Sequence, residues 1–280
     1  MADKITAQLG GAEETLFIPL AARARETGKR HPLLSDPRAV ELVQSIDLPV
    51  GKYDRGRGSV VMVLRTALFD AWVRSFLDTH PHGTVVEIGT GLNTRFDRVD
   101  NGTVHWFDLD LPDTIALRRR FFADTDRRHS LAASVLDDDW MDRVATSPGP
   151  YLFVAEAVLV YLPEDDVRRT LTRIAHRFPD AGIALDTYSR RMMRMQHNRV
   201  EAAGLDARWG WACDDPRALE SLGLRLVEST TIARPPQPLR RRLPLGYRIT
   251  LPLLHQFLLR IGAFRVALLH TRPHPDGPGA

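Results

Sequence analysis

A glycine turn followed at a distance by an acidic residue is the strongest chemical signal in this 280-residue sequence. Residues 85–91 run from β-branched side chains into Gly89 and Gly91, and glycines at such a turn let the backbone approach a bound ligand. Asp110 lies 21 residues after Gly89, at the end of a second strand-like segment. A carboxylate there can accept both hydroxyls of a ribose, so the pattern indicates a nucleotide-type cofactor site.

The spacing of the glycines discriminates between two classes of cofactor. Dinucleotide-binding turns have a third glycine that permits close helix–strand contact beside a pyrophosphate. Here Thr94 occupies that position, and the next glycine is Gly102. S-adenosylmethionine contains no pyrophosphate, so the Glu87-x-Gly89-x-Gly91 pattern favours it. A tight strand-to-helix turn beside a surface acid is the non-functional alternative.

The composition excludes several other classes of protein. A lone cysteine, Cys213, rules out an intrachain disulfide scaffold and a thiolate zinc site, and it fits a reducing cytoplasm. The net charge of +3 is small, and the arginine clusters at 118–120 and 240–242 are short, so we expect solvated arginines and no nucleic-acid partner. Residues 1–8 show no signal peptide, and no run reaches the roughly 18 apolar residues of a membrane span. We therefore expect a cytoplasmic protein without a membrane partner.

The hydrophobic periodicity predicts an α/β fold with a doubly wound, mostly parallel sheet, because strand-like and helix-like segments alternate after residue 80. We expect strands at 84–88, 104–108, 130–134, 151–155, 182–187 and 224–230, and helices at 93–98, 112–122, 137–145, 164–177 and 215–222. Residues 251–269 are interpreted as a buried helix or a strand pair.

This pattern divides the chain into five expected regions. Residues 1–80 have helical patterns at 14–27, 36–46 and 60–80, which predict a helical N-terminal extension or cap. Within it, Asp36 is suited to cap a helix that begins at Pro37. The other regions are a cofactor-binding core at 81–187, a methionine- and arginine-rich substrate lid at 188–214, a segment that completes the sheet at 215–270, and a flexible tail at 271–280.

Three motifs, in order and spacing, resemble the leucine carboxyl methyltransferase family, and within it the bacterial polyketide O-methyltransferases of the tetracenomycin type. The motifs are EIGTGLNTRF at 87–96, WFDLDLP at 106–112 and AEAVLVYL at 155–162. The likeness extends from residues 15–24 to 214–217, so it covers most of the chain. It implies a Rossmann-like class I methyltransferase that uses S-adenosylmethionine, and it is specific to a family but not to a substrate.

The resemblance implies where the nucleoside part of the donor binds. Gly89 and Gly91, with Glu87 in the same motif, match the residues that hold the donor. Asp110 matches the acid that binds the ribose, and Asp108 lies close by in the sequence.

The resemblance also assigns residues to the two ends of the donor. Arg65 matches the family arginine that binds the methionine carboxylate, a task for which a guanidinium is well suited. Glu156 matches a glutamate near the methionine amino group. Ser134 and Val135 match the position beside the adenine ring, where the usual acid is displaced to Asp137.

Some residues depart from the family pattern. Asn93 stands where aspartate is common, and Thr90 where alanine is common. Asparagine can still cap a helix, so we expect donor binding to survive with an altered local charge. Without the resemblance, Arg65 would be interpreted as a solvated helix arginine and Glu156 as a surface acid.

The type of acceptor decides whether methyl transfer needs a base. A carboxylate is already a nucleophile at neutral pH, so alignment in a dry pocket suffices, whereas a phenol usually needs a base. Of the ten histidines, we regard His197 and His255 as the candidates for that base. Tyr161 and Tyr188 follow the fourth and fifth strands, whose carboxyl ends face the ligand crevice in this class of fold, so with His197 they are our catalytic candidates. Tyr161 would pack on the donor or position the acceptor. A half-buried ring is the alternative for Tyr161, and no metal-ligand spacing is present.

We therefore expect an S-adenosylmethionine-dependent O-methyltransferase that acts on a small molecule such as a secondary metabolite. Carboxyl esterification is the first hypothesis and methylation of a phenol or other hydroxyl is the second. A non-catalytic nucleotide-binding partner protein is the alternative from a different class. The sequence chooses neither the acceptor nor the oligomeric state.

Overall fold

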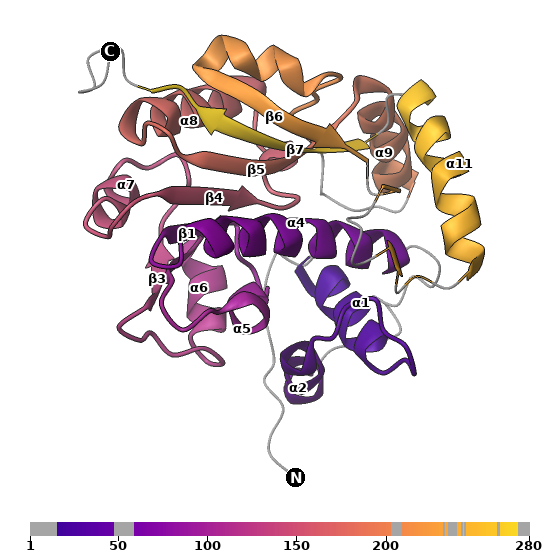
Figure 1. Cartoon of the computed structure of the whole chain (residues 1–280), viewed down its shortest axis with the longest axis horizontal. Coiled ribbons are helices and arrows are strands. Elements are labelled where there is room, and N and C mark those ends of the chain that lie inside the picture. Colours follow the sequence, from indigo (N-terminus) through magenta and orange to yellow (C-terminus); the bar gives the residue numbers. More distant parts are fainter. Residues whose placement is uncertain are drawn as a thin grey trace.

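A seven-stranded sheet forms the centre of the protein (Figure 1). The computed structural model describes residues 16–47, 59–202, 209–231, 233–234, 240–241, 243, 245–261 and 264–273. The strands are β1 (Thr84–Ile88), β2 (His105–Asp110), β3 (Arg128–Ala132), β4 (Tyr151–Ala155), β5 (Gly182–Tyr188), β6 (Leu224–Thr230) and β7 (Phe264–Thr271).

The order of the strands defines where a ligand crevice belongs. The sheet has the order β3-β2-β1-β4-β5-β7-β6, in which β1 to β5 are parallel and β7 is antiparallel to both of its neighbours. The predicted doubly wound, mostly parallel sheet is confirmed. The order reverses between β1 and β4, and in such sheets ligands bind beside the carboxyl ends of the strands at this switch point.

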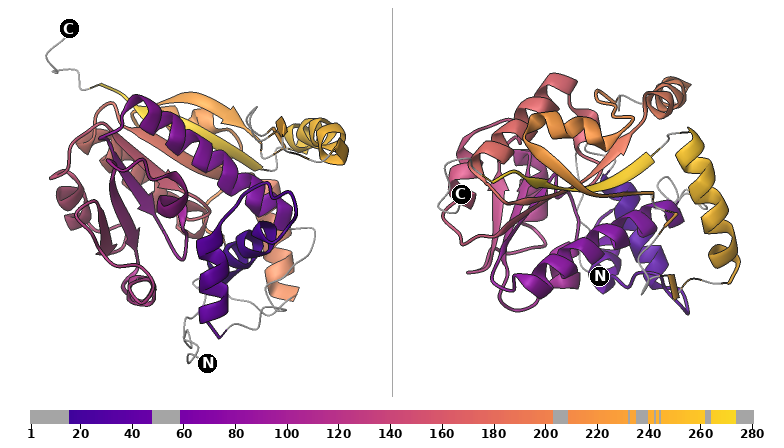
Figure 2. Two further views of the ribbon diagram at one scale, coloured as in Figure 1. Left: turned by 60° about the horizontal axis from the view of Figure 1, so that its bottom comes forward. Right: turned by 45° about the horizontal axis from the view of Figure 1, so that its top comes forward.

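Helices cover both faces of the sheet (Figures 1 and 2). They are α1 (Phe17–Thr27), α2 (Pro37–Ser45), α4 (Ser59–Thr79), α5 (Arg95–Val99), α6 (Pro112–Arg118), α7 (Asp139–Val144), α8 (Glu164–Arg177), α9 (Arg190–Ala202) and α11 (Leu245–Ile261), with shorter 3-10 turns η3 (Leu159–Tyr161) and η4 (Pro216–Leu222). Val85 packs with Phe69 of α4 on one face, whereas the next residue, Val86, packs with Val167 of α8 on the other. Burial on both faces explains why β1 is a continuous apolar run.

The helices at the N-terminal end form a layer over the carboxyl ends of the strands. Asp36 caps α2 as predicted: its Oδ1 accepts a hydrogen bond of 2.9 Å from the backbone N–H of Ala39, and Pro37 is the first helical residue. Phe17 and Leu42 of this layer pack against Leu92 in the loop after β1. The three helical patterns expected in this region therefore correspond to α1, α2 and α4, and α1 and α2 lie against the glycine turn.

Two sequence-based predictions of strands and helices were wrong. The third strand begins at Arg128 and ends at Ala132, two residues before its predicted end. Residues 251–269 are neither a single buried helix nor a strand pair, because α11 ends at Ile261 and β7 begins at Phe264. The strand β7 was missed because its apolar residues continue the pattern of the helix before it. Among the described helices, none combines the length and the hydrophobicity that a membrane span requires.

Candidate functional site

The glycine turn after β1 adopts a backbone conformation that its sequence requires. Gly89 and Gly91 have φ angles of +62° and +49°, in the left-handed region that favours glycine. A Cβ at position 89 would lie 2.3 Å from a methyl group of Val158, so a larger residue cannot fit. The backbone N–H of Gly91 donates a hydrogen bond of 2.7 Å to Asp110 Oδ2, which ties the turn to the end of β2.

Asp110 presents a half-buried carboxylate at the tip of β2. Its Oδ1 accepts a hydrogen bond of 2.8 Å from the backbone N–H of Leu111, and burial raises its pKa above the ordinary value. Each carboxylate oxygen can accept more than one hydrogen bond, so both retain capacity for hydroxyl donors. The position is suited to a ribose.

Asp108, two residues earlier, is engaged by two arginines. It is fully buried, and its carboxylate lies 2.9 Å from Arg118 and 2.7 Å from Arg128. Burial alone would raise its pKa, but the two arginines hold the pKa below the ordinary value. Asp108 also accepts a hydrogen bond of 2.9 Å from the hydroxyl of Thr90, which holds the glycine turn against β2. The two acids of the second motif therefore have different surroundings.

The helix α4 brings Arg65 to the carboxyl ends of β4 and β5, where it meets two other residues singled out by the sequence. Its Nε donates a hydrogen bond of 2.9 Å to Glu156 Oε1, and its Nη1 donates one of 3.1 Å to the hydroxyl of Tyr188. That hydroxyl donates in turn to Asp186, at 3.0 Å. Within the described part of the chain, the remaining nitrogen of Arg65, Nη2, donates to no acceptor, so one edge of the guanidinium is available.

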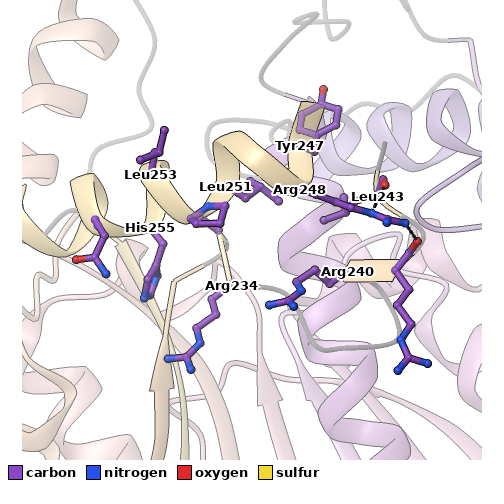
Figure 3. Close-up of a pocket in the computed structure, with 12 residues that line it drawn as sticks. Arg234, Arg240, Leu243, Tyr247, Arg248, Leu251, Leu253 and His255 are labelled. Atoms are coloured by element: carbon purple, nitrogen blue, oxygen red, sulfur yellow. Dashed lines mark hydrogen bonds between the residues drawn. The ribbon is translucent and has the colours of Figure 1, made fainter. Parts of the chain in front are cut away.

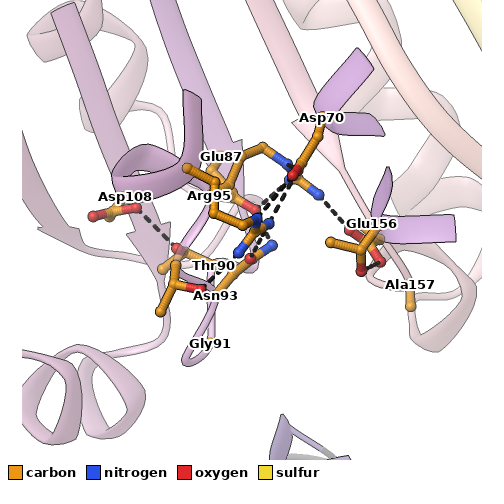
Figure 4. Close-up of polar contacts among 12 residues, drawn as sticks. Asp70, Glu87, Thr90, Gly91, Asn93, Arg95, Asp108, Glu156 and Ala157 are labelled. Atoms are coloured by element: carbon orange, nitrogen blue, oxygen red, sulfur yellow. Dashed lines mark hydrogen bonds and ion pairs between the residues drawn. The ribbon is translucent and has the colours of Figure 1, made fainter. Parts of the chain in front are cut away.

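Arg95, which the sequence analysis did not single out, is at the centre of the polar contacts (Figure 4). It is fully buried and pairs with Asp70 at 2.8 Å, with Glu87 at 2.5 Å and with Glu156. The structure thereby connects the glycine motif to the end of β4. The expectation that the arginines other than Arg65 are solvated is wrong for the buried Arg23, Arg95, Arg98, Arg118 and Arg128, each of which forms an ion pair with a carboxylate.

Carboxyl groups outnumber guanidinium groups in this network. Its members are Arg23, Arg65, Arg95 and Arg98 with Asp36, Asp70, Glu87, Glu156 and Asp186. Burial raises the pKa of Asp186 to about 6 despite the nearby Arg65, and burial also raises the pKa of Glu87. Glu87 Oε2 is buried without a hydrogen-bond donor among the described residues. The network therefore has unused capacity to accept hydrogen bonds and positive charge.

Asp186 and Ala157 form a second feature that the sequence did not indicate. The backbone N–H of Ala157 lies 3.0 Å and 3.1 Å from the two carboxylate oxygens of Asp186. This contact comes with a φ of +58° at Ala157, a conformation that costs a residue with a Cβ about 1–2 kcal/mol. No sequence signal marks such a position, because alanine is unremarkable in a motif of apolar residues.

The other predicted binding residues follow β3. Ser134 lies in the loop at the carboxyl end of that strand, where its backbone N–H donates a hydrogen bond of 2.8 Å to Asp137. The hydroxyl of Ser134 accepts a hydrogen bond of 3.1 Å from the backbone N–H of Leu136, and Val135 is buried beside it. Asp137 therefore shapes this loop, at the same edge of the sheet as Asp110.

The predicted tyrosines and histidines occupy three separate surroundings. Tyr161 is half-buried in η3 and belongs to the same apolar cluster as Tyr188. His197, on α9, has its Nε2 2.9 Å from the carbonyl oxygen of Trp209; because a carbonyl only accepts, this nitrogen carries the proton. His255, on α11, has its Nδ1 2.7 Å from the hydroxyl of Thr231, and burial together with Arg234 and Arg265 lowers its pKa. In the described ranges, neither histidine is hydrogen-bonded to the Arg65 cluster.

Comparison with known proteins identifies a family to which this chain is similar, two relatives and a solved structure with the same fold. A profile of the family described as leucine carboxyl methyltransferase matches residues 17–175. The tetracenomycin polyketide synthesis O-methyltransferase TcmP of Streptomyces glaucescens is 33% identical, over 82% of this chain and 87% of that protein. The S-adenosyl-L-methionine-dependent methyltransferase dpfgK of Gibberella zeae is 28% identical, over 78% and 81% of the two chains. A DUF574 family protein from Streptomyces avermitilis shares the fold with a TM-score of 0.57 at 16% identity, over 90% of this chain and 97% of that chain.

Proposed function

Because the chain belongs to the leucine carboxyl methyltransferase family and is an S-adenosylmethionine-dependent O-methyltransferase, we propose that it methylates a carboxylate of a small, polyketide-like molecule. When bound, the donor would supply a methyl group on a positively charged sulfur, to whose carbon an acceptor oxygen would bond in line as the C–S bond breaks and S-adenosylhomocysteine leaves. The residues of the chain bind the donor, align the acceptor and keep water away.

The proposal for the donor site rests on the convergence of the glycine turn, Asp110 and Arg65 at the switch point of the sheet. Asp110 has lone pairs for the ribose hydroxyls, and Gly89 and Gly91 let the backbone come close. The available Nη2 of Arg65 suits the methionine carboxylate of the donor, since guanidinium–carboxylate hydrogen bonds are charge-assisted.

The charge of the network fits the rest of the donor. S-adenosylmethionine carries a sulfonium and an ammonium against a single carboxylate, so it brings excess positive charge. The network has more carboxyl than guanidinium groups, and Glu87 Oε2 has no donor among the residues that the structure describes. We propose that Glu156 and Glu87 accept this positive charge, whereas Asp108 and Arg95 hold the turn in place.

The surroundings of Tyr188 favour an acceptor that is already an anion. Burial and the neighbouring Asp186 raise the pKa of Tyr188 well above its ordinary value, so its hydroxyl remains protonated at neutral pH. It is also engaged with both Asp186 and Arg65. We therefore assign Tyr188 to positioning Arg65, with Tyr161 beside it, and not to proton abstraction. A carboxylate needs no base.

Methylation of a phenol is the second candidate, and one observation favours it. The lowered pKa of His255 leaves its imidazole neutral at pH 7, as a general base requires. The hydrogen bonds do not distinguish His255 from His197, because each has one ring nitrogen engaged, by Thr231 and by Trp209 respectively.

Calorimetry with S-adenosylmethionine tests the donor site. We expect Asp110→Asn to weaken binding at least about tenfold, since a hydrogen bond to a charged group contributes about 1.5–3 kcal/mol. Asp113→Asn, on the exposed start of α6, is the matched control and should bind like the unmodified chain. Equal affinity of the two variants would remove Asp110 from the site.

Transfer of a labelled methyl group tests the acceptor. Aromatic carboxylic acids and phenols with the same ring system are offered in parallel, and each product is treated with mild alkali. A methyl ester releases its label under alkali, whereas an aryl methyl ether retains it. We expect labelled product from the acids and release of the label; a stable product from the phenols alone would establish the second candidate instead.

A further inference from the structure

A cavity of about 620 Å³ lies apart from the glycine turn, between the end of β6 and α11 (Figure 3). Its volume is within the range of small-molecule sites. Arg234, Arg240 and His255 lie on the same side of α11 in this cavity, and Leu243 and Leu251 form part of its wall. The cavity thus combines an apolar wall with cationic side chains.

The arginines of this cavity carry uncompensated charge. Arg234, Arg240 and Arg241 are exposed, and none of them forms an ion pair with a described carboxylate. No aspartate or glutamate is among the described residues that line the cavity. Arg248 differs, because it donates to the backbone carbonyl oxygens of Leu243 and Arg241 and so holds the wall in shape. Three guanidinium groups are therefore left for an anion.

The apolar wall of the cavity is continuous with the helix that carries Arg65. Leu243 and Leu251 belong to the same buried cluster as Val63 and Leu64 of α4. Because Leu64 immediately precedes Arg65, the cavity and the donor-side cluster lie against the same turns of α4. An acceptor that entered the cavity would meet that helix.

The register of the sheet relates Tyr188 to Thr231, the residue that is hydrogen-bonded to His255 of the cavity. Tyr188 pairs with Phe264 of β7, and the next pair along that strand is Thr187 with Arg265. On the other side of β7, Thr230 pairs with Val266, so Thr231, which is hydrogen-bonded to His255, continues toward Arg265. Two strand spacings correspond to about 10 Å. The backbone of Thr231, whose side chain is hydrogen-bonded to His255 in the cavity wall, therefore lies about 10 Å across the sheet from the end of β5 that carries Tyr188.

We propose that this cavity binds an acidic group of the acceptor that is remote from the oxygen to be methylated. The inference rests on the proposed methyl transfer, and it narrows the acceptor to elongated apolar molecules with a carboxylate or similar anion at the far end. Arg234 and Arg240 bind that anion through charge-assisted hydrogen bonds, and Leu251 with Tyr247 contacts the apolar body.

Equilibrium binding of two fluorescent probes to the full chain tests the site. Pyrenebutyrate and pyrenebutanol share an apolar body and differ in the terminal carboxylate. We expect pyrenebutyrate to bind at least about tenfold more tightly, and the ratio of the two Kd values to shrink as salt screens the exposed arginines. Saturating S-adenosylmethionine should leave pyrenebutyrate bound.

The combined substitution Arg234→Gln and Arg240→Gln should bring the ratio of the two Kd values close to one. Arg225→Gln, at the opposite end of β6, is the matched control and should preserve the ratio. Equal binding of the two probes, a preference that survives the double substitution, or displacement of pyrenebutyrate by S-adenosylmethionine would overturn the proposal.

The same variants separate this proposal from that for the donor site. Calorimetry should show unchanged affinity of the double variant for S-adenosylmethionine, because neither arginine lies in the donor network. A chain that prefers pyrenebutyrate but does not bind S-adenosylmethionine would contradict the methyltransferase assignment and leave the anion site standing. A chain that binds S-adenosylmethionine but shows no preference between the probes would contradict the anion site alone.

Discussion

Two groups of arginines in this protein differ in burial and in their carboxylate partners. Those around the glycine turn, such as Arg95 and Arg118, are fully buried and bound to carboxylates. Those of the α11 cavity, Arg234, Arg240 and Arg241, are exposed and lack a carboxylate partner among the described residues. The paired arginines fix the shape of the turn, whereas the unpaired arginines are the ones for which we propose an anionic ligand.

The surroundings, and not the residue type, cause this difference. A guanidinium can be buried only where carboxylates compensate for its desolvation, and Arg95 has three of them. At the cavity the arginines are exposed, so their charge needs no carboxylate partner. Each group can be tested by removing one member.

The largest effect is expected at the centre of the buried network. Arg95→Met leaves Asp70, Glu87 and Glu156 buried without their main partner, which should lower the free energy of unfolding by about 3–5 kcal/mol. Arg240→Met, in the cavity, should change it by less than about 0.5 kcal/mol. Urea denaturation measures both. Similar losses in the two variants would contradict the division into structural and ligand-facing arginines.

The next largest effect is the pH dependence of stability that comes from Asp186, one of the carboxyl groups that outnumber the guanidinium groups of the network. The folded-state pKa of Asp186, about 6, lies above the ordinary value of 3.8, so the folded protein holds this proton more strongly than the unfolded chain. The contribution of Asp186 to stability is therefore fully present below about pH 4 and is lost as the pH rises to about 6. The loss amounts to at most about 3 kcal/mol.

Asp186→Asn should accordingly flatten the dependence of stability on pH between about 4 and 6. Urea denaturation at a series of pH values measures this dependence, with the exposed Asp113→Asn as a control that should follow the unmodified chain. Below this window, Asp70 acts in the other direction, because Arg98 and Arg95 overcome its burial and lower its pKa to about 2. An unchanged slope in Asp186→Asn would show that Asp186 is already ionised at pH 4.

The smallest effect concerns the backbone beside the network. Ala157→Gly removes the cost of a left-handed alanine and should raise the free energy of unfolding by about 1 kcal/mol. Ala175→Gly, within α8, should lower it by about 1 kcal/mol because glycine disfavours a helix interior. Thermal denaturation distinguishes the two signs. A loss of stability at both positions would contradict the strained conformation of Ala157.

Most of the sheet and part of the site follow from local patterns in the sequence. The β-branched run of β1, the apolar run of β4 and the glycines after β1 could be interpreted from the sequence, because each pattern depends only on neighbouring residues. Arg65, Glu156 and Tyr188 were singled out separately, and the structure brings them together. Their convergence could be expected because parallel strands end at one edge of a sheet.

The rest depends on contacts between distant segments, which periodicity does not encode. Arg95 lies in a predicted helix start and has the sequence context of a surface arginine, yet α4 and β4 supply the carboxylates that bury it. Asp186 follows a continuous apolar run in β5, and nothing in the sequence indicates that Arg65 and the backbone of Ala157 lie beside it. The same limit applies to Arg234 and Arg240, whose cavity exists only because α11 packs beside α4.

A structure of the chain with S-adenosylhomocysteine bound tests the central claim most directly. We predict that the ribose hydroxyls lie within hydrogen-bond distance of the Asp110 carboxylate and that the amino-acid carboxylate contacts Arg65. The α11 cavity should remain free of this ligand. Binding of the nucleoside in that cavity, or a ribose out of reach of Asp110, would contradict the assignment of the two sites.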